Sequence, residues 1–267
     1  MSYHQIGIGT YKLQDDICFE IVKQGLEYGY RLIDTAQLYG NHKQVADGIK
    51  MSGIPRSDIF ITTKIHNKNI RNLTIAESID QMMKELDTQY LDLILLHNPV
   101  KNYDLAYAEL IRCQTHFNIK NIGVSNFLCN HLEQIQKLTS VRPYLNQIEL
   151  NVLNKQIDLT KYHKDSGIIT QSHTNIKTHL NSTELISISS NVLNKCKLAT
   201  PTEYLLSYPI KENIGIIPGT SSVEHLKQNY DFYQWCRENL TQLNDINYDD
   251  YIDDVNCENC ENFNNID

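Results

Sequence analysis

The sequence of 267 residues lacks any long uninterrupted apolar stretch. Hydrophobic residues make up 41% of the chain, yet no run approaches the roughly 18 uncharged apolar residues that a membrane-spanning helix requires. The sequence MSYHQIGIGTY at the amino terminus also lacks the basic segment followed by an apolar one that is typical of a secretory signal. These absences favour a soluble, cytoplasmic protein with no membrane partner.

The cysteines lack the spacing of a disulfide framework. There are seven, an odd number, and they are scattered, which fits reduced thiols in a reducing compartment. Only Cys257 and Cys260 form a CxxC pair, and neither a second pair nor a nearby histidine supplies the other ligands of a structural zinc site. We therefore expect no metal site.

Bases are absent from the end of the chain. Residues 244–267 contain eight acids and no base, whereas residues 1–243 hold 24 acids and 24 bases and are neutral. An Asn- and Asp-rich end is typical of disorder, and nothing in this distribution favours nucleic-acid binding. We predict one domain over residues 1–243, followed by a disordered acidic tail over 244–267.

The sequence does contain short apolar runs that alternate with helical patterns. Amphipathic segments predict helices over Ile17–Tyr28, Leu73–Leu86, Leu105–Phe117 and Thr202–Lys211. Eight apolar runs predict strands: IGIG from residue 6, RLID from 31, DIFITTK from 58, LDLILLH from 91, IKNIGVS from 119, YLNQIEL from 144, GIITQS from 167 and NIGIIPG from 213. Eight strands alternating with helices favour a parallel (β/α)8 barrel, which typically takes roughly 250 residues.

An open, doubly wound sheet is the alternative fold. It normally carries the dinucleotide motif GxGxxG after its first strand, and the first strand here gives GIGTYK, without the third glycine. The hydrolase motif GxSxG is absent as well, because GVSNF from residue 123 lacks the second glycine. Both absences favour the barrel.

Polar residues follow the apolar runs where a barrel would gather them at one mouth, namely Asp34, Lys64 and His97, with Tyr39 in the loop after Asp34. The Lys64 ammonium is expected to stabilise the Tyr39 phenolate and to lower its pKa from about 10. Asp34 would hold the lysine charged, and His97 would polarise a substrate carbonyl. Singly, each residue also fits a turn, a core contact or a solvated strand end. Jointly they suit protonation of a carbonyl oxygen as a hydride reaches the carbon.

Several motifs in one order resemble the aldo-keto reductase superfamily over residues 6–233. These motifs are GxGTY, DTAxxYGN, a strand ending in lysine, LDLILLHxP, IGVSNF, NQIELN and IPGTSSVEHLKQN. The resemblance implies a TIM barrel that binds NADPH or NADH across its mouth without a Rossmann fold, and a small carbonyl or alcohol substrate. It also implies Tyr39 as the proton donor, supported by Asp34, Lys64 and His97.

The resemblance further assigns the nicotinamide carboxamide to Ser125, Asn126 and Gln147, because a carboxamide needs both donors and acceptors. The two amides also suit the satisfaction of buried backbone groups. Gly9 and Thr10 fall where relatives approach the cofactor.

The phosphate and adenine end of the cofactor is implied to lie on Thr220 and Asn229. Thr174 also carries a hydroxyl that fits phosphate, although both threonines suit turns. Many NADPH-dependent members have a lysine and an arginine where this chain has Gly219 and His225. Each charge-assisted contact to a 2′-phosphate is worth roughly 1.5–3 kcal/mol, so we expect a weakened preference for NADPH over NADH.

Other departures from the family pattern concern the substrate side of the site. His173 would stack on the nicotinamide in place of a larger ring. His66 and Asn98 stand where many reductases have large aromatics, which predicts a more polar carbonyl pocket with His66 and His97 as substrate contacts. The amino-terminal hairpin that caps the barrel in relatives is expected to be missing or shortened, with an effect on stability rather than chemistry.

Two functions remain open from the sequence. One is an NAD(P)H-dependent carbonyl reductase or alcohol dehydrogenase. The other is a catalytically weak nucleotide-binding regulatory or scaffold protein on the same barrel, motivated by the altered cofactor segments and the acidic tail. The complete set of four residues favours the enzyme, because a pure binding protein does not need Lys64 to tune Tyr39. The physiological substrate stays open, and a monomer is expected.

Overall fold

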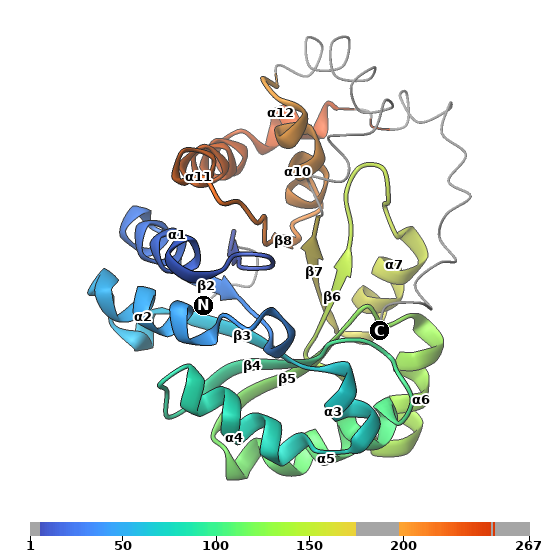
Figure 1. Cartoon of the computed structure of the whole chain (residues 1–267). Helices are drawn as coiled ribbons and strands as arrows, with labels where there is room; N and C mark the ends of the chain where they lie inside the picture. The colour runs from blue at the N-terminus through green and yellow to red at the C-terminus, as the bar shows by residue number, and fades with distance from the viewer. Residues whose placement is uncertain (1–5, 175–197, 247, 249–267) are drawn as a thin grey trace.

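The protein is a closed barrel of eight parallel strands. The computed structural model describes residues 6–174, 198–246 and 248. Its strands form one sheet in the order β1 to β8, and every neighbouring pair is parallel. The first and last strands also meet, through a parallel bridge between Ile6 and Ile216 and a 2.8 Å hydrogen bond from Gly7 N to Ile216 O. The predicted (β/α)8 fold is confirmed (Figure 1).

Short strands alternate with helices along the chain. The strands are β1 (Ile8–Gly9), β2 (Leu32–Asp34), β3 (Phe60–Ile65), β4 (Leu91–Leu96), β5 (Ile119–Ser125), β6 (Leu145–Glu149), β7 (Ile169–His173) and β8 (Gly215–Ile216). The helices are α1 (Asp15–Tyr28), α2 (His42–Ser52), α3 (Asn67–Asn72), α4 (Ile75–Glu85), α5 (Tyr103–His116), α6 (Cys129–Thr139), α7 (Ile157–Ser166), α10 (Pro201–Lys211), α11 (Val223–Glu238) and α12 (Leu240–Asn244), with two 3-10 turns, η1 (Gln37–Tyr39) and η2 (Arg56–Asp58). The four predicted helices agree with α1, α4, α5 and α10 to within two residues at each end.

Local sequence explains where several helices begin and end. Gly53 and Gly167 follow α2 and α7 with φ of 71° and 70°, a left-handed conformation that glycine adopts without strain. Helix α10 begins with Pro201, whose missing N–H costs nothing in the first turn. The hydroxyl of Thr200 caps the same helix by accepting a hydrogen bond from Glu203 N.

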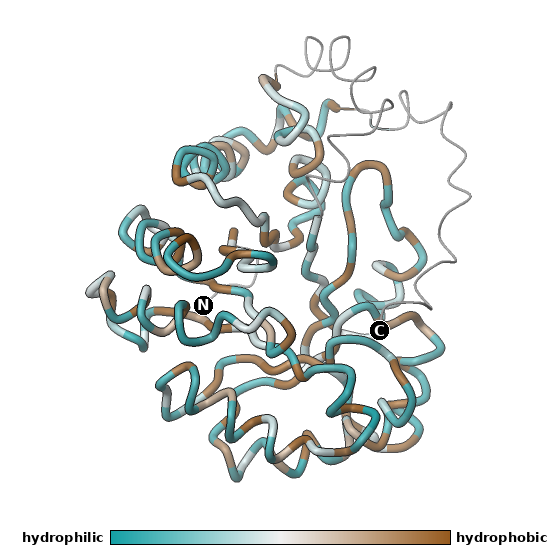
Figure 2. The backbone as a smooth tube through the Cα atoms, viewed as in Figure 1, coloured by the Kyte–Doolittle hydropathy of each residue, from teal (hydrophilic) through white to brown (hydrophobic). Residues whose placement is uncertain are grey.

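Two apolar layers hold the barrel together. The larger one lies between strands and helices, where each amphipathic helix buries one face. The smaller one contains buried side chains from four strands and from the residue that follows β8, namely Leu32, Phe60, Leu93, Leu95, Leu145 and Ile217. In Figure 2 the hydrophobic colour runs along β4 and β5, and the helices alternate between hydrophobic and hydrophilic segments. These two layers consist of apolar side chains and do not include the polar side chains near the carboxyl ends of the strands, which can therefore form a site.

The barrel domain extends past the predicted boundary at residue 243. Helix α12 runs to Asn244, and Ile246 and Tyr248 are buried. The Tyr248 hydroxyl donates to Ser207 Oγ at 2.8 Å, and Lys211 Nζ donates to the carbonyl oxygen of Ile246 at 3.0 Å. The charge pattern placed the boundary too early because these apolar side chains lie among acids. The rest of the predicted tail, Cys257 and Cys260 included, lies outside the described residues, as do residues 1–5, to which the hairpin prediction refers.

Asn41 fastens the loop that carries Tyr39. Its amide is fully buried, donates to the carbonyl oxygens of Thr10 and Leu13 and accepts from the Thr35 hydroxyl, each at 2.9 Å. One side chain therefore joins the loop after β1 to the loop after β2.

An Asn41→Ala variant is expected to lose roughly 2–4 kcal/mol of unfolding free energy, because it removes three buried hydrogen bonds. Urea unfolding followed by circular dichroism measures the change. Asn130→Ala, at an exposed position of α6, is the matched control and should unfold like the wild type. Equal stability of the two variants would contradict the role given to Asn41.

Candidate active site

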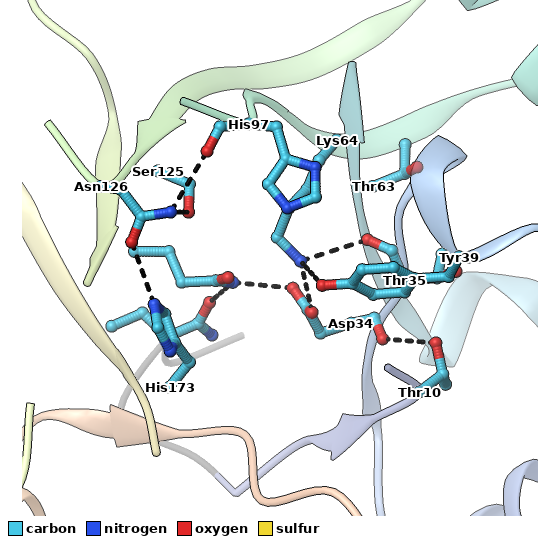
Figure 3. Close-up of polar contacts among 12 residues, drawn as sticks. Thr10, Asp34, Thr35, Tyr39, Thr63, Lys64, His97, Ser125, Asn126 and His173 are labelled. Atoms are coloured by element: carbon cyan, nitrogen blue, oxygen red, sulfur yellow. Dashed lines mark hydrogen bonds and ion pairs between the residues drawn. The ribbon is translucent and has the colours of Figure 1, made fainter. Parts of the chain in front are cut away.

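The predicted catalytic residues come from three consecutive strands and one loop. Asp34 ends β2, Lys64 lies near the end of β3, and His97 follows β4. Tyr39 ends the 3-10 turn after β2. Because parallel strands place their carboxyl ends at one mouth, these side chains meet, and Figure 3 shows Asp34, Tyr39 and Lys64 pointing toward one another beside His97.

Lys64 is the centre of this group. Its Nζ donates to Asp34 Oδ1 at 2.5 Å, to the Tyr39 hydroxyl oxygen at 3.2 Å and to the Thr35 carbonyl oxygen at 3.3 Å. Lys64 and Asp34 are only 1% and 2% exposed, so each charge is stabilised in the interior by the opposite charge of the other. Burial lowers the pKa of Lys64, but Asp34 and Tyr39 raise that pKa by more, and the ammonium form is retained.

The pKa of Tyr39 shifts opposite to the sequence-based expectation. Burial raises the pKa of the phenol, and this outweighs the lowering by the charge and hydrogen bond of Lys64. The prediction of a lowered pKa was wrong because it ignored the cost of moving a phenolate out of water. Tyr39 is therefore held protonated at neutral pH and carries the proton that a general acid must donate.

His97 is a neutral ring beside Tyr39. Burial lowers the pKa of His97 to about 3, with a further contribution from the charge of Lys64. The two ring centroids lie 5.9 Å apart with the planes at 75°. Nδ1 of His97 is buried and has no hydrogen-bond partner among the described residues. The ring can orient a carbonyl group by hydrogen bonding without contributing a positive charge.

Neutral polar side chains form a hydrogen-bonded group at the same barrel mouth. Asn126 Nδ2 donates to Asn98 Oδ1 at 2.9 Å and to Ser125 Oγ at 3.3 Å, and its Oδ1 lies 3.1 Å from Nε2 of His173. Asn98 in turn donates to Asn67 Oδ1 at 3.1 Å. The structure thus brings together the predicted carboxamide contacts Ser125 and Asn126 with His173.

The side chain of Gln147 contacts Asp34 directly. Its Nε2 donates to Asp34 Oδ2 at 2.7 Å and to Gln171 Oε1 at 2.9 Å. Sequence reasoning missed Gln171 and the link to Asp34. The sequence held no signal for this link, because it depends on the register of β6 with β7, which pairs Gln147 with Gln171 on one face of the sheet.

The substrate side contains one predicted residue and one that was missed. His66 caps α3 by accepting from Lys68 N, and it is partly exposed. Tyr11 is 54% exposed and lies 5.1 Å from Tyr39 between ring centroids. Its aromatic ring, directly after the GIGT sequence, was the available signal for a side chain at this mouth. Tyr11 adds a partly exposed aromatic ring beside the polar side chains of the mouth.

The remaining predicted cofactor residues lie around the junction of β1 and β8. Gly9 and Gly219 form a parallel bridge, and a Cβ on Gly9 would come within 2.7 Å of the Ile217 carbonyl oxygen, so only glycine fits there. Thr220 Oγ1 accepts a hydrogen bond from Ser222 N, and Asn229 is buried on α11.

Two predicted contacts have their hydroxyls engaged within the protein. Thr10 is fully buried and donates to the Asp34 carbonyl oxygen at 2.9 Å. Thr174 donates to the Leu150 carbonyl oxygen at 3.0 Å. Both threonines support loops in this arrangement, and their contact with a cofactor stays a prediction.

The donor set fits a nicotinamide dinucleotide. Ser125, Asn126 and His173 offer neutral donors and acceptors, because burial lowers the pKa of His173, and a carboxamide needs such partners. For the phosphate end of such a cofactor, the 16-residue helix α11 begins after Ser222, and the amino end of a helix suits a phosphate group.

Within the ranges given above, no group of three or more His, Cys, Asp or Glu side chains is placed to hold a metal ion. None of the helices in those ranges combines the length and apolar character needed to cross a membrane.

Comparisons with known proteins agree with this geometry. The family model described as "Aldo/keto reductase family" matches residues 5–247. An aldo-keto reductase of Mycobacterium marinum is 32% identical over 248 residues, covering 91% of this chain and 87% of the relative. A methylglyoxal reductase of Yersinia pestis is 33% identical over 234 residues, covering 86% of each chain.

Solved structures give the same result. An aldo/keto reductase from Brucella melitensis superposes with a TM-score of 0.77 at 31% identity, over 90% of this chain and 94% of the other. MGS-M4, an aldo-keto reductase from a deep-sea metagenome library of the Medee basin, superposes with a TM-score of 0.80 at 29% identity, over 100% and 96%. With the family model matched over most of its length, the chain belongs to the aldo/keto reductase family.

Proposed function

We propose that this protein reduces aldehydes or ketones to alcohols, with Tyr39 as the proton donor. Aldo/keto reductases are NAD(P)H-dependent oxidoreductases that act on carbonyl groups. The observation that carries the proposal is the Lys64 ammonium, which contacts Asp34 and the Tyr39 hydroxyl at the same time beside a neutral His97.

Bound NADPH or NADH supplies the hydride in this chemistry. Tyr39 and His97 hold the carbonyl oxygen, and the phenol gives its proton to that oxygen as negative charge develops there. Lys64 stabilises the phenolate that remains, and Asp34 keeps Lys64 charged and in place. Ser125, Asn126 and Gln147 would hold the carboxamide of the bound cofactor, and His173 would contact its nicotinamide ring.

The direct test is binding followed by turnover. The purified protein is titrated with NADPH and NADH by fluorescence, and small aldehydes and ketones are then supplied with the tighter-binding cofactor. We expect micromolar-range binding and steady oxidation of the cofactor with several carbonyl compounds. Binding without turnover would instead support a regulatory or scaffold protein, and the absence of binding would contradict both functions.

We also propose that this protein discriminates weakly between NADPH and NADH. The segment 215–226 contains no lysine or arginine, and its only basic residue is His225, at an exposed position of α11. A 2′-phosphate near this segment meets no permanent positive charge from it.

A His225→Arg variant is expected to bind NADPH about tenfold more tightly and NADH with unchanged affinity, since one charge-assisted hydrogen bond to the 2′-phosphate is gained. Fluorescence titration at fixed ionic strength measures both constants. His225→Gln, which adds no charge, is the control. An equal gain for both cofactors would place His225 away from the 2′-phosphate and contradict the proposal.

A further inference from the structure

The Asp34 carboxylate uses both of its oxygens inside the barrel. Oδ1 accepts from Lys64 Nζ at 2.5 Å, and Oδ2 accepts from Gln147 Nε2 at 2.7 Å. Asp34 is 2% exposed, so water cannot replace either partner without opening the mouth. A buried carboxylate is costly unless it is hydrogen-bonded, and Gln147 therefore fixes the side of Asp34 that faces away from Lys64.

The orientation of the Gln147 amide is set by its two neighbours. Its NH₂ group donates to Asp34 Oδ2 and to Gln171 Oε1, which are both acceptors. A reversed amide would turn its oxygen toward two other oxygens. Gln171 thus holds Gln147 in the only orientation that offers a donor to Asp34.

Gln171 achieves this at a cost to the fold. It is 1% exposed, and its Nε2 is buried without a hydrogen-bond partner among the described residues. Turning the Gln171 amide over would bring its NH₂ group against the NH₂ group of Gln147, so the unpaired nitrogen cannot be relieved by rotation. A glutamine that serves only to fill space has no need of this arrangement.

We propose that Gln171 is a positioning residue for the reaction. Its side-chain oxygen orients Gln147, Gln147 holds Asp34, and Asp34 holds Lys64 under the Tyr39 hydroxyl. The side chain of Gln171 makes no hydrogen bond to Tyr39 or Lys64 in the described part of the chain and acts through Gln147. The inference rests on the proposed reductase function for its kinetic consequence, but the hydrogen-bond chain itself is independent of turnover.

The test is a double-mutant cycle with shape-conserving substitutions. Gln171→Met and Gln147→Met are each expected to lower kcat, by about tenfold for Gln171→Met, while the melting temperature shows that the variants fold. The double variant is expected to be no slower than Gln147→Met alone, because Gln171 has no route to Lys64 other than Gln147. Independent, multiplying losses in the double variant would overturn the proposal.

Thr62→Val is the matched control. Thr62 is fully buried in β3, and its hydroxyl, like Gln171 Nε2, has no partner among the described residues. Its removal should leave kcat unchanged, which separates the positioning effect from a general response of the barrel interior to loss of a polar atom. A tenfold fall in kcat for Thr62→Val would also overturn the proposal.

A second readout does not depend on activity. In protein labelled with ¹⁵N-lysine, the buried Lys64 ammonium should give a resonance protected from proton exchange, and this protection should weaken in Gln171→Met but persist in Thr62→Val. Unchanged protection in Gln171→Met would overturn the inference even if the wild type reduces carbonyls. Weakened protection in Gln171→Met, together with a wild type that turns over no carbonyl compound, would refute the reductase function alone.

Discussion

A Tyr39→Phe variant is expected to reduce aldehydes with a kcat lower by roughly 10²–10⁴-fold, the usual contribution of a positioned general acid. The substitution removes only the hydroxyl that Lys64 contacts at 3.2 Å and leaves the ring in place. Steady-state kinetics with saturating cofactor measures the loss. Fluorescence titration should show that cofactor binding is retained, because the phenol hydroxyl is not among the proposed cofactor contacts.

The control and the pH profile make this result specific. Tyr162→Phe removes a phenol hydroxyl from α7 and should leave the rate unchanged. In the wild type, the rate of reduction should hold through neutral pH and fall only on the alkaline side, because burial raises the pKa of Tyr39 and the donor proton is lost only above that pKa. The residual rate of Tyr39→Phe should lack this alkaline fall. An unchanged rate in Tyr39→Phe would remove the reductase proposal.

The barrel was predictable because its signals are local. Eight apolar runs, the helical patterns between them and the missing third glycine of a Rossmann motif are all readable without contacts. The convergence of Asp34, Lys64 and His97 was predictable for the same reason, since parallel strands put their ends at one mouth. The direction of the Tyr39 pKa shift could not be predicted. It depends on how deeply the phenol is buried, and a sequence shows only which residues are adjacent along the chain.

The same limit explains the contacts that were missed. Gln147 matched a family motif and was read as a cofactor contact, which stays a prediction, but the motif did not show that its Nε2 donates to Asp34 and Gln171. That arrangement depends on the register of β6 with β7, which no single motif encodes. The predicted domain boundary came too early in the sequence because Tyr248 lies among acids yet is buried against the barrel.

A Lys64→Met variant is expected to lose about 3–5 kcal/mol of unfolding free energy together with nearly all turnover. Methionine has a similar length but no charge, so the Asp34 carboxylate stays buried with Gln147 as its remaining partner among the contacts described above. Urea unfolding measures the stability, and aldehyde reduction measures the rate. A variant as stable as the wild type would contradict the buried ion pair.

Combining Lys64→Met with Asp34→Asn separates the structural role of the pair from its chemical role. The double variant removes both charges at once, and replacing a buried ion pair by neutral groups is often close to neutral for stability, so most of the lost free energy should return. Turnover should not return, because neither side chain can stabilise the Tyr39 phenolate. Recovered turnover in the stable double variant would mean that the ammonium is dispensable for proton donation. Recovered stability without turnover places the purpose of this ion pair in catalysis rather than in holding the barrel together.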